Sequence, residues 1–166
     1  MTTTHPFTTD PADMAAAFSA FPSGVAALAA EVAGESVVMI ASSFTVGVSY
    51  DPPMVSFAAQ KSSSTWPILA SAPTIGVSIL GEAHAESTRQ LASREKHKRL
   101  HGVEWTRMDS GAIFLAGSPT WLECVIEHVY PAGDHDIIVF RVLAMFSDEI
   151  PSPLVWHRRQ IKLLPA

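Results

Sequence analysis

Hydroxyl side chains gather around one aromatic residue where an apolar segment ends, in the first third of the chain. They are Ser42, Ser43 and Thr45, which surround Phe44, and the turn signal Asp-Pro-Pro follows at residues 51–53. Backbone amides and hydroxyl groups at the end of a strand could bond the polar edge of a flat heterocycle. A plain strand end with a polar turn is the alternative.

A lysine followed by four hydroxyl residues is the second stretch with chemical potential. Lys61 precedes Ser62, Ser63, Ser64 and Thr65, and Trp-Pro then begins a short helix. Free amides at a helix start, together with hydroxyls and one cation, could hold a phosphate. The alternative is a serine-rich turn that caps the helix.

Residues 94–99 carry four cations in six positions and form the third stretch. Such a run could reach a phosphate or pyrophosphate group, and the alternative is a solvated helix end.

One histidine and one tryptophan in the C-terminal part of the chain are further candidates for ligand contacts. His135 directly follows the turn Gly-Asp and enters an apolar strand, so its ring should have a fixed direction. A local hydrogen bond within the turn is the alternative. Trp156, followed by His-Arg-Arg, could cover a ligand or could anchor the chain end.

Several enzyme signatures are missing. The chain has no G-x-G-x-x-G, so it lacks the Rossmann fingerprint, and it has no Walker loop, H-E-x-x-H or G-x-S-x-G motif. We expect no metal site, because His97 and His101 have no obvious third ligand. The single cysteine, Cys124, excludes an internal disulfide and is expected to be a small core or interface residue.

Composition favours one globular domain over residues 1–166. Hydrophobic residues make up 48% of the 166 positions and charged residues 16%, which allows a sizeable core. A net charge of -5 argues against nucleic acid or anionic membrane as partners. No secretory signal is apparent, and the longest apolar tract, residues 25–44, is interrupted by charged residues and glycine. We expect a soluble, cytoplasmic protein.

The patterns predict a mainly β chain. Asp10 and Pro11 predict a helix start, with Met14, Ala17, Phe18 and Phe21 at helical spacing. Strands are predicted over residues 25–32, 37–42, 54–58, 74–80, 121–130 and 136–146. Residues 82–100 predict the one longer polar helix. Residues 131–134 predict a hairpin turn before the last strand, which is apolar on nearly every position and should be buried on both faces. Strands outnumber helices and rarely alternate with them, which favours an antiparallel barrel.

Taken in order, these stretches resemble the flavin reductase-like family, the small reductase components of two-component flavin monooxygenases. The resemblance covers about residues 14–163, the core of the predicted domain. Its most specific part is S-S-F-T at residues 42–45 followed by D-P-P-M-V at residues 51–55. Further matches lie at residues 21–25, 61–65, 102–105, 121–124 and 133–135.

The resemblance implies an FMN-binding split β-barrel that works as a homodimer. Residues 42–45 would line the isoalloxazine ring, and Ala59, Gln60 and residues 61–65 would hold the ribityl chain and phosphate. Cations of residues 94–99 would add to the phosphate site, with Lys98 and Arg99 as candidates. His135 would lie near the nicotinamide. Trp156 would lie near the flavin, with donation across the subunit interface as one option.

Three departures leave details open. Ser78 stands where the family often has asparagine, residues 94–99 are about one residue longer than the usual segment, and Trp156 replaces a common tyrosine. They leave open the choice between FMN and FAD and the identity of the phosphate cation.

The implied activity is reduction of FMN or FAD by NADH or NADPH, with reduced flavin passing to a separate monooxygenase. Hydride transfer is cofactor chemistry and needs no protein nucleophile, acid or base. The protein contributes orientation, which lowers a barrier by about 7–11 kcal/mol in favourable cases. The alternatives are a split-barrel flavoprotein that acts on another acceptor and a flavin-binding module without turnover.

Overall fold

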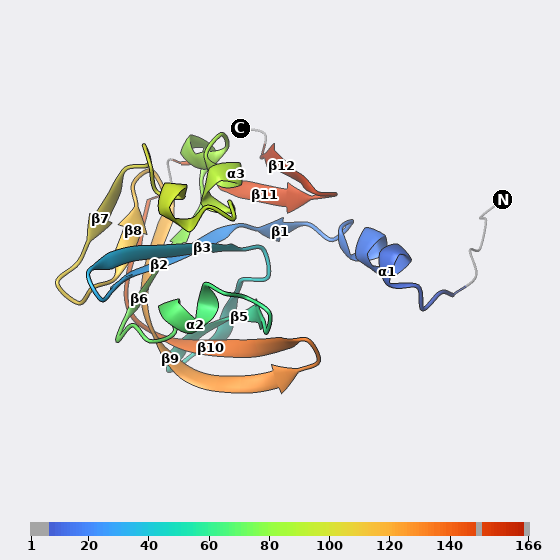
Figure 1. Ribbon diagram of the computed structural model, residues 1–166, viewed down its shortest axis with the longest axis horizontal. Coiled ribbons are helices and arrows are strands. Elements are labelled where there is room, and N and C mark those ends of the chain that lie inside the picture. Colours follow the sequence, from blue (N-terminus) through green and yellow to red (C-terminus); the bar gives the residue numbers. More distant parts are fainter. Residues whose placement is uncertain (1–6, 149–150, 165–166) are drawn as a thin grey trace.

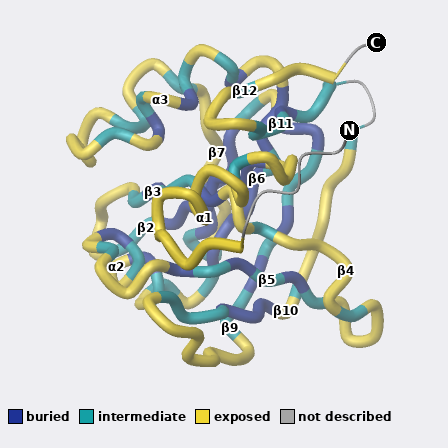
Figure 2. The backbone as a smooth tube through the Cα atoms, turned by 90° about the vertical axis from the view of Figure 1, so that its right-hand side faces the viewer, coloured by how far each residue is buried: buried dark blue, intermediate teal, exposed yellow. Residues whose placement is uncertain are grey.

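The computed structural model describes residues 7–148 and 151–164. Helix α1 (Pro11–Phe18) begins as predicted, because the Asp10 carboxylate accepts hydrogen bonds from Ala12 N at 2.8 Å and Asp13 N at 3.2 Å. The helix stops at Phe18, before the last of the residues that the spacing suggested. It projects from the body of the molecule (Figure 1), and it is exposed along its whole length (Figure 2).

Seven antiparallel strands form the main sheet, in the order β3-β2-β6-β9-β10-β5-β4. Their bounds are β2 (Ala26–Val32), β3 (Glu35–Ala41), β4 (Thr45–Tyr50), β5 (Pro53–Gln60), β6 (Ile75–Ile79), β9 (Thr120–Ala132) and β10 (His135–Ser147). The six strands that the sequence predicted are all among them, and the hairpin between the last two is confirmed. The chain is mainly β, with the split-barrel fold that the resemblance implied.

Smaller elements cover the sheet and its ends. A three-stranded sheet has the order β1-β11-β12, with β1 (Ser23–Gly24), β11 (Leu154–His157) and β12 (Gln160–Leu163), and β7 (Trp105–Arg107) pairs with β8 (Ile113–Leu115). The short helices are α2 (Trp66–Leu69), η1 (Glu82–His84), α3 (Thr88–Leu91) and η2 (Lys96–Lys98). None of the helices in the described ranges is long and apolar enough to cross a membrane.

Strand β2 separates two hydrophobic cores. Because side chains alternate along a strand, Leu28 faces the first core while Ala29 faces the second, and both are 0% exposed. Phe57 and Phe140 stack in the first core with ring centroids 5.7 Å apart. Cys124 also lies in the first core, and burial raises the pKa of its thiol to about 12, so it is an inert packing residue as expected.

Two predictions about single elements were wrong. Strand β10 is buried only over residues 138–140, and its second half exposes Leu143, Met145 and Phe146 at 47%, 66% and 51%. Strand β2, which is built mostly of small residues, is instead buried on both faces over residues 26–30, and β6 is buried on both faces over residues 75–78.

Residues 82–100 form three short helical pieces instead of one helix. The hydroxyls of Ser87 and Thr88 donate to the His84 carbonyl oxygen at 3.2 and 2.7 Å. Farther along, the Gln90 amide donates to the His101 carbonyl oxygen at 2.6 Å, which folds the segment back on itself. Side chains thus compete with the regular helical pattern.

Gly76 allows β8 to pass directly over β6. A Cβ atom at this position would lie 2.2 Å from the Ile113 carbonyl oxygen, closer than any real contact. Two residues on, the buried Ser78 hydroxyl accepts from Leu115 N at 2.9 Å, so both residues serve the same close approach.

We expect Gly76→Ala to lower the free energy of unfolding by about 3 kcal/mol, because the backbone of β8 must move to admit the methyl group. Urea denaturation checks this. Gly24→Ala is the matched control, since nothing lies within 4 Å of a Cβ there, and it should change stability by less than about 0.5 kcal/mol. Equal stabilities for the two variants would contradict the packing argument.

Candidate functional site

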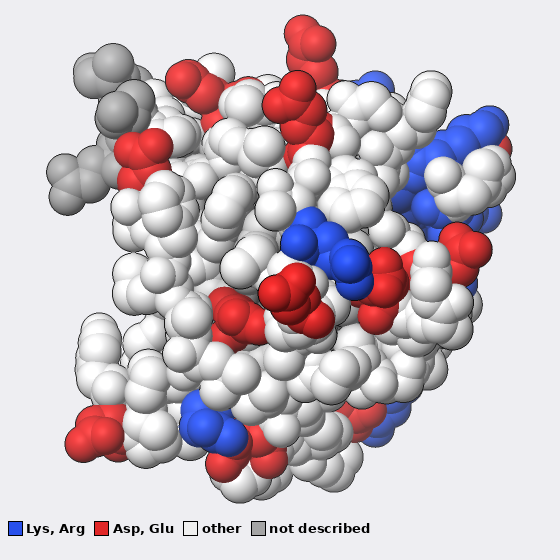
Figure 3. All heavy atoms as spheres, turned by 90° about the vertical axis from the view of Figure 1, so that its left-hand side faces the viewer, with Lys and Arg blue, Asp and Glu red and all other residues white. Residues whose placement is uncertain are grey.

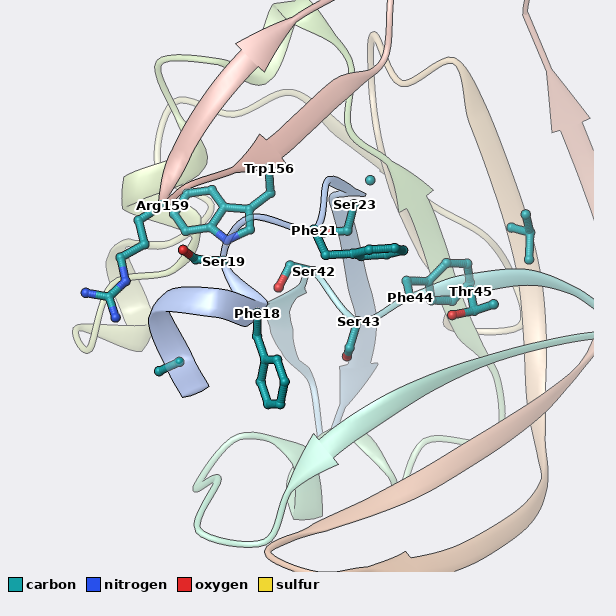
Figure 4. A pocket seen from close by; sticks show the side chains of 13 residues that line it. Phe18, Ser19, Phe21, Ser23, Ser42, Ser43, Phe44, Thr45, Trp156 and Arg159 are labelled. Carbon is teal, nitrogen blue, oxygen red and sulfur yellow. The ribbon is translucent and has the colours of Figure 1, made fainter. Parts of the chain in front are cut away.

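A cleft of about 1020 Å³ opens between the end of α1, β1, residues 42–46 and the β11–β12 hairpin. Its lining is aromatic and rich in hydroxyl groups (Figure 4). The side chains labelled there are Phe18, Ser19, Phe21, Ser23, Ser42, Ser43, Phe44, Thr45, Trp156 and Arg159. The cleft is therefore suited to a flat ring with polar edges.

Ser43 fastens the lining segment to the sheet. Its hydroxyl both donates to the Ala58 carbonyl oxygen and accepts from Ala58 N, each at 3.1 Å. Phe44 packs against the first core from the edge of the cleft. The hydroxyls of Ser42 and Thr45, by contrast, are exposed and have no hydrogen-bond partner within the part of the chain described here. These two groups remain available to a ligand.

Trp156 reaches the cleft from β11. It lies opposite Ser23 of β1 in the strand register, and its indole stands next to Arg159 (Figure 4). The hairpin is tied to the end of α1, because Arg158 N donates to the Ser19 carbonyl oxygen at 2.6 Å. One subunit alone thus brings Trp156 and residues 42–45 to the same cleft.

The serine-rich loop is held by two of the four cations in residues 94–99. Lys96 Nζ donates to the Ser64 carbonyl oxygen at 2.8 Å, and Arg99 Nη1 donates to Thr65 Oγ1 at 3.1 Å. Lys98 instead forms an ion pair with Glu95, so it does not meet the loop. Lys96 is not one of the two named candidates, but it lies in the run that the sequence singled out and it contacts the loop.

Arg99 and Ser63 hold the backbone around this loop. Arg99 also donates to the carbonyl oxygens of Val38 and Ser93, both at 2.7 Å. Partial burial lowers the pKa of Arg99, yet a guanidinium stays charged at neutral pH. Ser63 Oγ accepts from Trp66 N, in the first residue of α2, at 3.1 Å, although the N-cap residue Thr65 itself forms no side-chain capping bond. Thr65, Lys96 and Arg99 line a small cavity of about 200 Å³.

His135 lies at the end of β10, opposite Gln60 of β5. Its Nδ1 is 2.7 Å from the Asp134 carboxylate, and this hydrogen bond holds the pKa of Asp134 below its usual value. Lys61 Nζ donates to the Gly133 carbonyl oxygen at 2.7 Å, so it secures the same turn. The local hydrogen bond is present, and it fixes the direction of the imidazole.

The structure gathers the predicted site residues into three groups. Residues 42–45 and Trp156 line the cleft, Thr65 and Arg99 meet at the small cavity, and Gln60, Lys61 and His135 cluster at the ends of β5 and β10. Ala59 is 1% exposed, and its side chain packs in the first core instead of facing a cavity.

Phe18 and Phe21 are lining residues that were not predicted as ligand contacts, whereas Arg159 lies in the segment 156–159 that could cover a ligand. The exposure of Phe18 and Phe21 on a short helix and its exit could not be read from their spacing, which matches a buried helix face equally well.

A mainly β barrel with an aromatic, hydroxyl-lined cleft at its edge defines a class of small flavin-binding split barrels. The flavin reductase like domain family matches residues 18–165. The stachydrine N-demethylase reductase subunit Stc3 of Rhizobium meliloti is 34% identical over 139 residues, which are 83% of this chain and 60% of that protein. The reductase component of 4-hydroxyphenylacetate 3-monooxygenase of Thermus thermophilus is 30% identical over 89% of this chain and 93% of its own length.

A solved structure has the same fold. The NADH:FAD oxidoreductase SgcE6 of Streptomyces globisporus, in complex with NAD and FAD fragments, superposes with a TM-score of 0.87 at 27% identity. The match covers 96% of this chain and 98% of that one. The chain belongs to the flavin reductase-like family.

Arg99 and Lys98, the two predicted phosphate cations, should differ in how much they contribute to the stability of the fold. We expect Arg99→Ala to lower the free energy of unfolding by about 2–3 kcal/mol, because several hydrogen bonds to a charged group are lost. Lys98→Ala removes only an exposed ion pair and should cost less than about 1 kcal/mol. Urea denaturation of both variants measures the difference. A similar loss in both would show that Arg99 does not anchor the loop.

Proposed function

We propose that the chain catalyses reduction of FMN or FAD by NADH or NADPH and binds the flavin ring in the cleft lined by residues 42–45 and Trp156. The observation that carries the proposal is the pair of hydroxyls, Ser42 and Thr45, which have no hydrogen-bond partner among the described residues and lie in an otherwise largely aromatic cleft. An isoalloxazine ring has a polar edge and two apolar faces, and this lining suits both.

The residues around the cleft would act by position. When bound, the flavin supplies the capacity to accept hydride from reduced nicotinamide. Ser42 and Thr45 would hold the polar edge of the ring, and Phe44 and Trp156 would fix its plane and exclude water. Proximity and orientation are the contributions that such a site makes to the rate.

The serine-rich loop would hold the phosphate of FMN. Lys96 and Arg99 place two positive charges against residues 64 and 65, and Ser62 and Ser64 expose their hydroxyls. Lys96 and Arg99 are therefore the favoured phosphate cations, in preference to Lys98.

His135 would orient the carboxamide of the nicotinamide. Its Nδ1 is occupied by Asp134, so Nε2 is the nitrogen left for a ligand. The strand register supports this role, since Ala58, which is hydrogen-bonded to Ser43, pairs with Ile137, two residues along β10 from His135.

A second copy of the chain would cover the apolar surface that a single copy leaves open. Phe18 and Phe21 beside α1 are 73% and 77% exposed, and Met145 on β10 is 66% exposed. Exposed apolar side chains of this size favour an interface. The proposal therefore includes a homodimer. It also includes a cytoplasmic location and a separate monooxygenase that receives the reduced flavin.

The test of the function is oxidation of NADH and NADPH by the purified protein, with and without added FMN or FAD. We expect oxidation that depends on added flavin. Thr45→Val should raise the flavin dissociation constant about five- to tenfold, because one hydrogen bond is lost. Thr106→Val, an exposed β7 position outside the cleft, is the matched control and should bind flavin normally. A protein that binds flavin but oxidises neither nucleotide would overturn the reductase proposal.

The role of His135 has its own test. We expect His135→Ala to raise the Michaelis constant for NADH severalfold, with flavin affinity unchanged, because nucleotide orientation is lost while the ring site stays intact. Steady-state kinetics at saturating flavin measures this. If both the Michaelis constant and the turnover number stay at their original values, His135 does not touch the nucleotide.

A further inference from the structure

A second large cavity adjoins the cleft on the far side of the β11–β12 hairpin. Its volume is about 690 Å³, and it lies between residues 85–92 and the hairpin. Trp156 and Arg159 line both the cleft and this cavity, so they form the shared wall. A ligand that fills the cleft and extends past these two side chains would enter the second cavity.

Two guanidinium groups with no intramolecular partner face the second cavity. The side chains of Arg89 and Arg159 make no hydrogen bond or ion pair within residues 7–148 and 151–164, and both residues are exposed. By contrast, Arg107 pairs with Glu31 and Arg141 pairs with Glu127. Figure 3 shows acidic and basic side chains next to one another in this way on another face of the molecule. The cations at the cavity are therefore left available for an anion.

Arg159 is held at the cavity by an unfavourable backbone conformation. Residues 158 and 159 join β11 to β12 in a two-residue turn, with φ values of 51° and 62°. Asn-Gly is the preferred sequence for such a turn, because side chains with a Cβ disfavour positive φ. Two arginines in these positions indicate that their side chains serve a purpose other than the stability of the turn.

The lining residues of the second cavity offer groups that can bind each part of a nucleotide. Arginine guanidiniums form paired hydrogen bonds with phosphate oxygens. Glu86 supplies one carboxylate, which can accept a hydrogen bond from a ribose hydroxyl, and its charge leaves the two arginines in excess. The indole of Trp156 and the side chain of Ile161 offer apolar surface to a base.

We propose that this cavity binds the adenosine diphosphate moiety of a dinucleotide whose redox-active ring occupies the cleft, with Arg89 and Arg159 on the diphosphate. FAD and NAD(P)H share this moiety, whereas FMN lacks it. The proposal rests on the proposed function, because that function supplies the ring in the cleft. It makes Arg89 a residue that distinguishes dinucleotides from FMN.

Titration with ADP alone tests the cavity without any turnover. Isothermal titration calorimetry should detect ADP binding to the original protein and at least tenfold weaker binding to Arg89→Ala, since a charge-assisted contact to phosphate is lost. Lys162→Ala is the matched control: it removes a positive charge from the same hairpin, at an exposed position outside both cavities, and should change ADP affinity less than twofold. The proposal would be overturned if the original protein did not bind ADP at millimolar concentration. It would also be overturned if Arg89→Ala and Lys162→Ala bound ADP with equal affinity.

Two further measurements on Arg89→Ala distinguish the source of the moiety. If the cavity serves FAD, the dissociation constant of FAD rises at least tenfold and that of FMN does not. If it serves the nicotinamide nucleotide, the Michaelis constant for NADH rises with FMN as acceptor. Loss of ADP binding with neither change would overturn the assignment to a dinucleotide. Failure of the proposed function is a separate result, since it would appear as absent NADH oxidation in the original protein.

Discussion

The burial of β2 on both faces is the packing constraint on which the arrangement of the sites depends. Residues 25–30 read V-A-A-L-A-A, with Val25 in the second core and Leu28 in the first, so one layer can pack on each side without spreading the sheet. The inner layer closes the barrel around Phe57 and Phe140. The outer layer carries β8, β11 and α3, and β11 brings Trp156 to the rim. A larger residue on β2 would separate the barrel from the elements that complete the cleft.

The position of β3 beside β2 explains how the wall of the cleft and the serine-rich loop are held relative to each other. Strand β3 runs beside β2 and presents the Val38 carbonyl oxygen to Arg99, while the chain leaving β3 becomes the hydroxyl-rich wall of the cleft. Arg99 in turn holds Thr65 at the start of α2. The wall of the cleft and the serine-rich loop are thus connected through one strand and one guanidinium, which fixes their separation.

Alternation and turn residues were enough to predict the strands, because these signals are local. The role of residues 42–45 came from the family resemblance, since the residues alone left a plain strand end as an alternative. Other features depend on contacts that a pattern does not contain. The apolar run of β10 predicts burial, but it cannot tell whether the same chain or a second copy provides the cover. Helical spacing over residues 82–100 predicts one helix, but it does not show that the hydroxyl groups of Ser87 and Thr88 bind the His84 carbonyl oxygen and interrupt the helix. Lys96 and Arg99 meet the loop together because three residues make one turn of a 3₁₀ helix, whereas an α-helical reading gives no reason to separate them from Lys98.

Some cations of the chain bind the backbone and others are left for a ligand, and the chemistry of hydride transfer explains why. Hydride transfer between two rings requires no proton relay from the protein, so charged groups are needed only to hold the ligands or the loops around them. Arg99 is committed to the backbone, and its position therefore does not depend on whether a ligand is bound. Within the described residues, Arg89 and Arg159 form no such hydrogen bonds, and they line the cavity that adjoins the cleft. In the proposed function, in which the flavin is released, the wall of the cleft would stay in place, and Arg89 and Arg159 would form their hydrogen bonds only with the ligand.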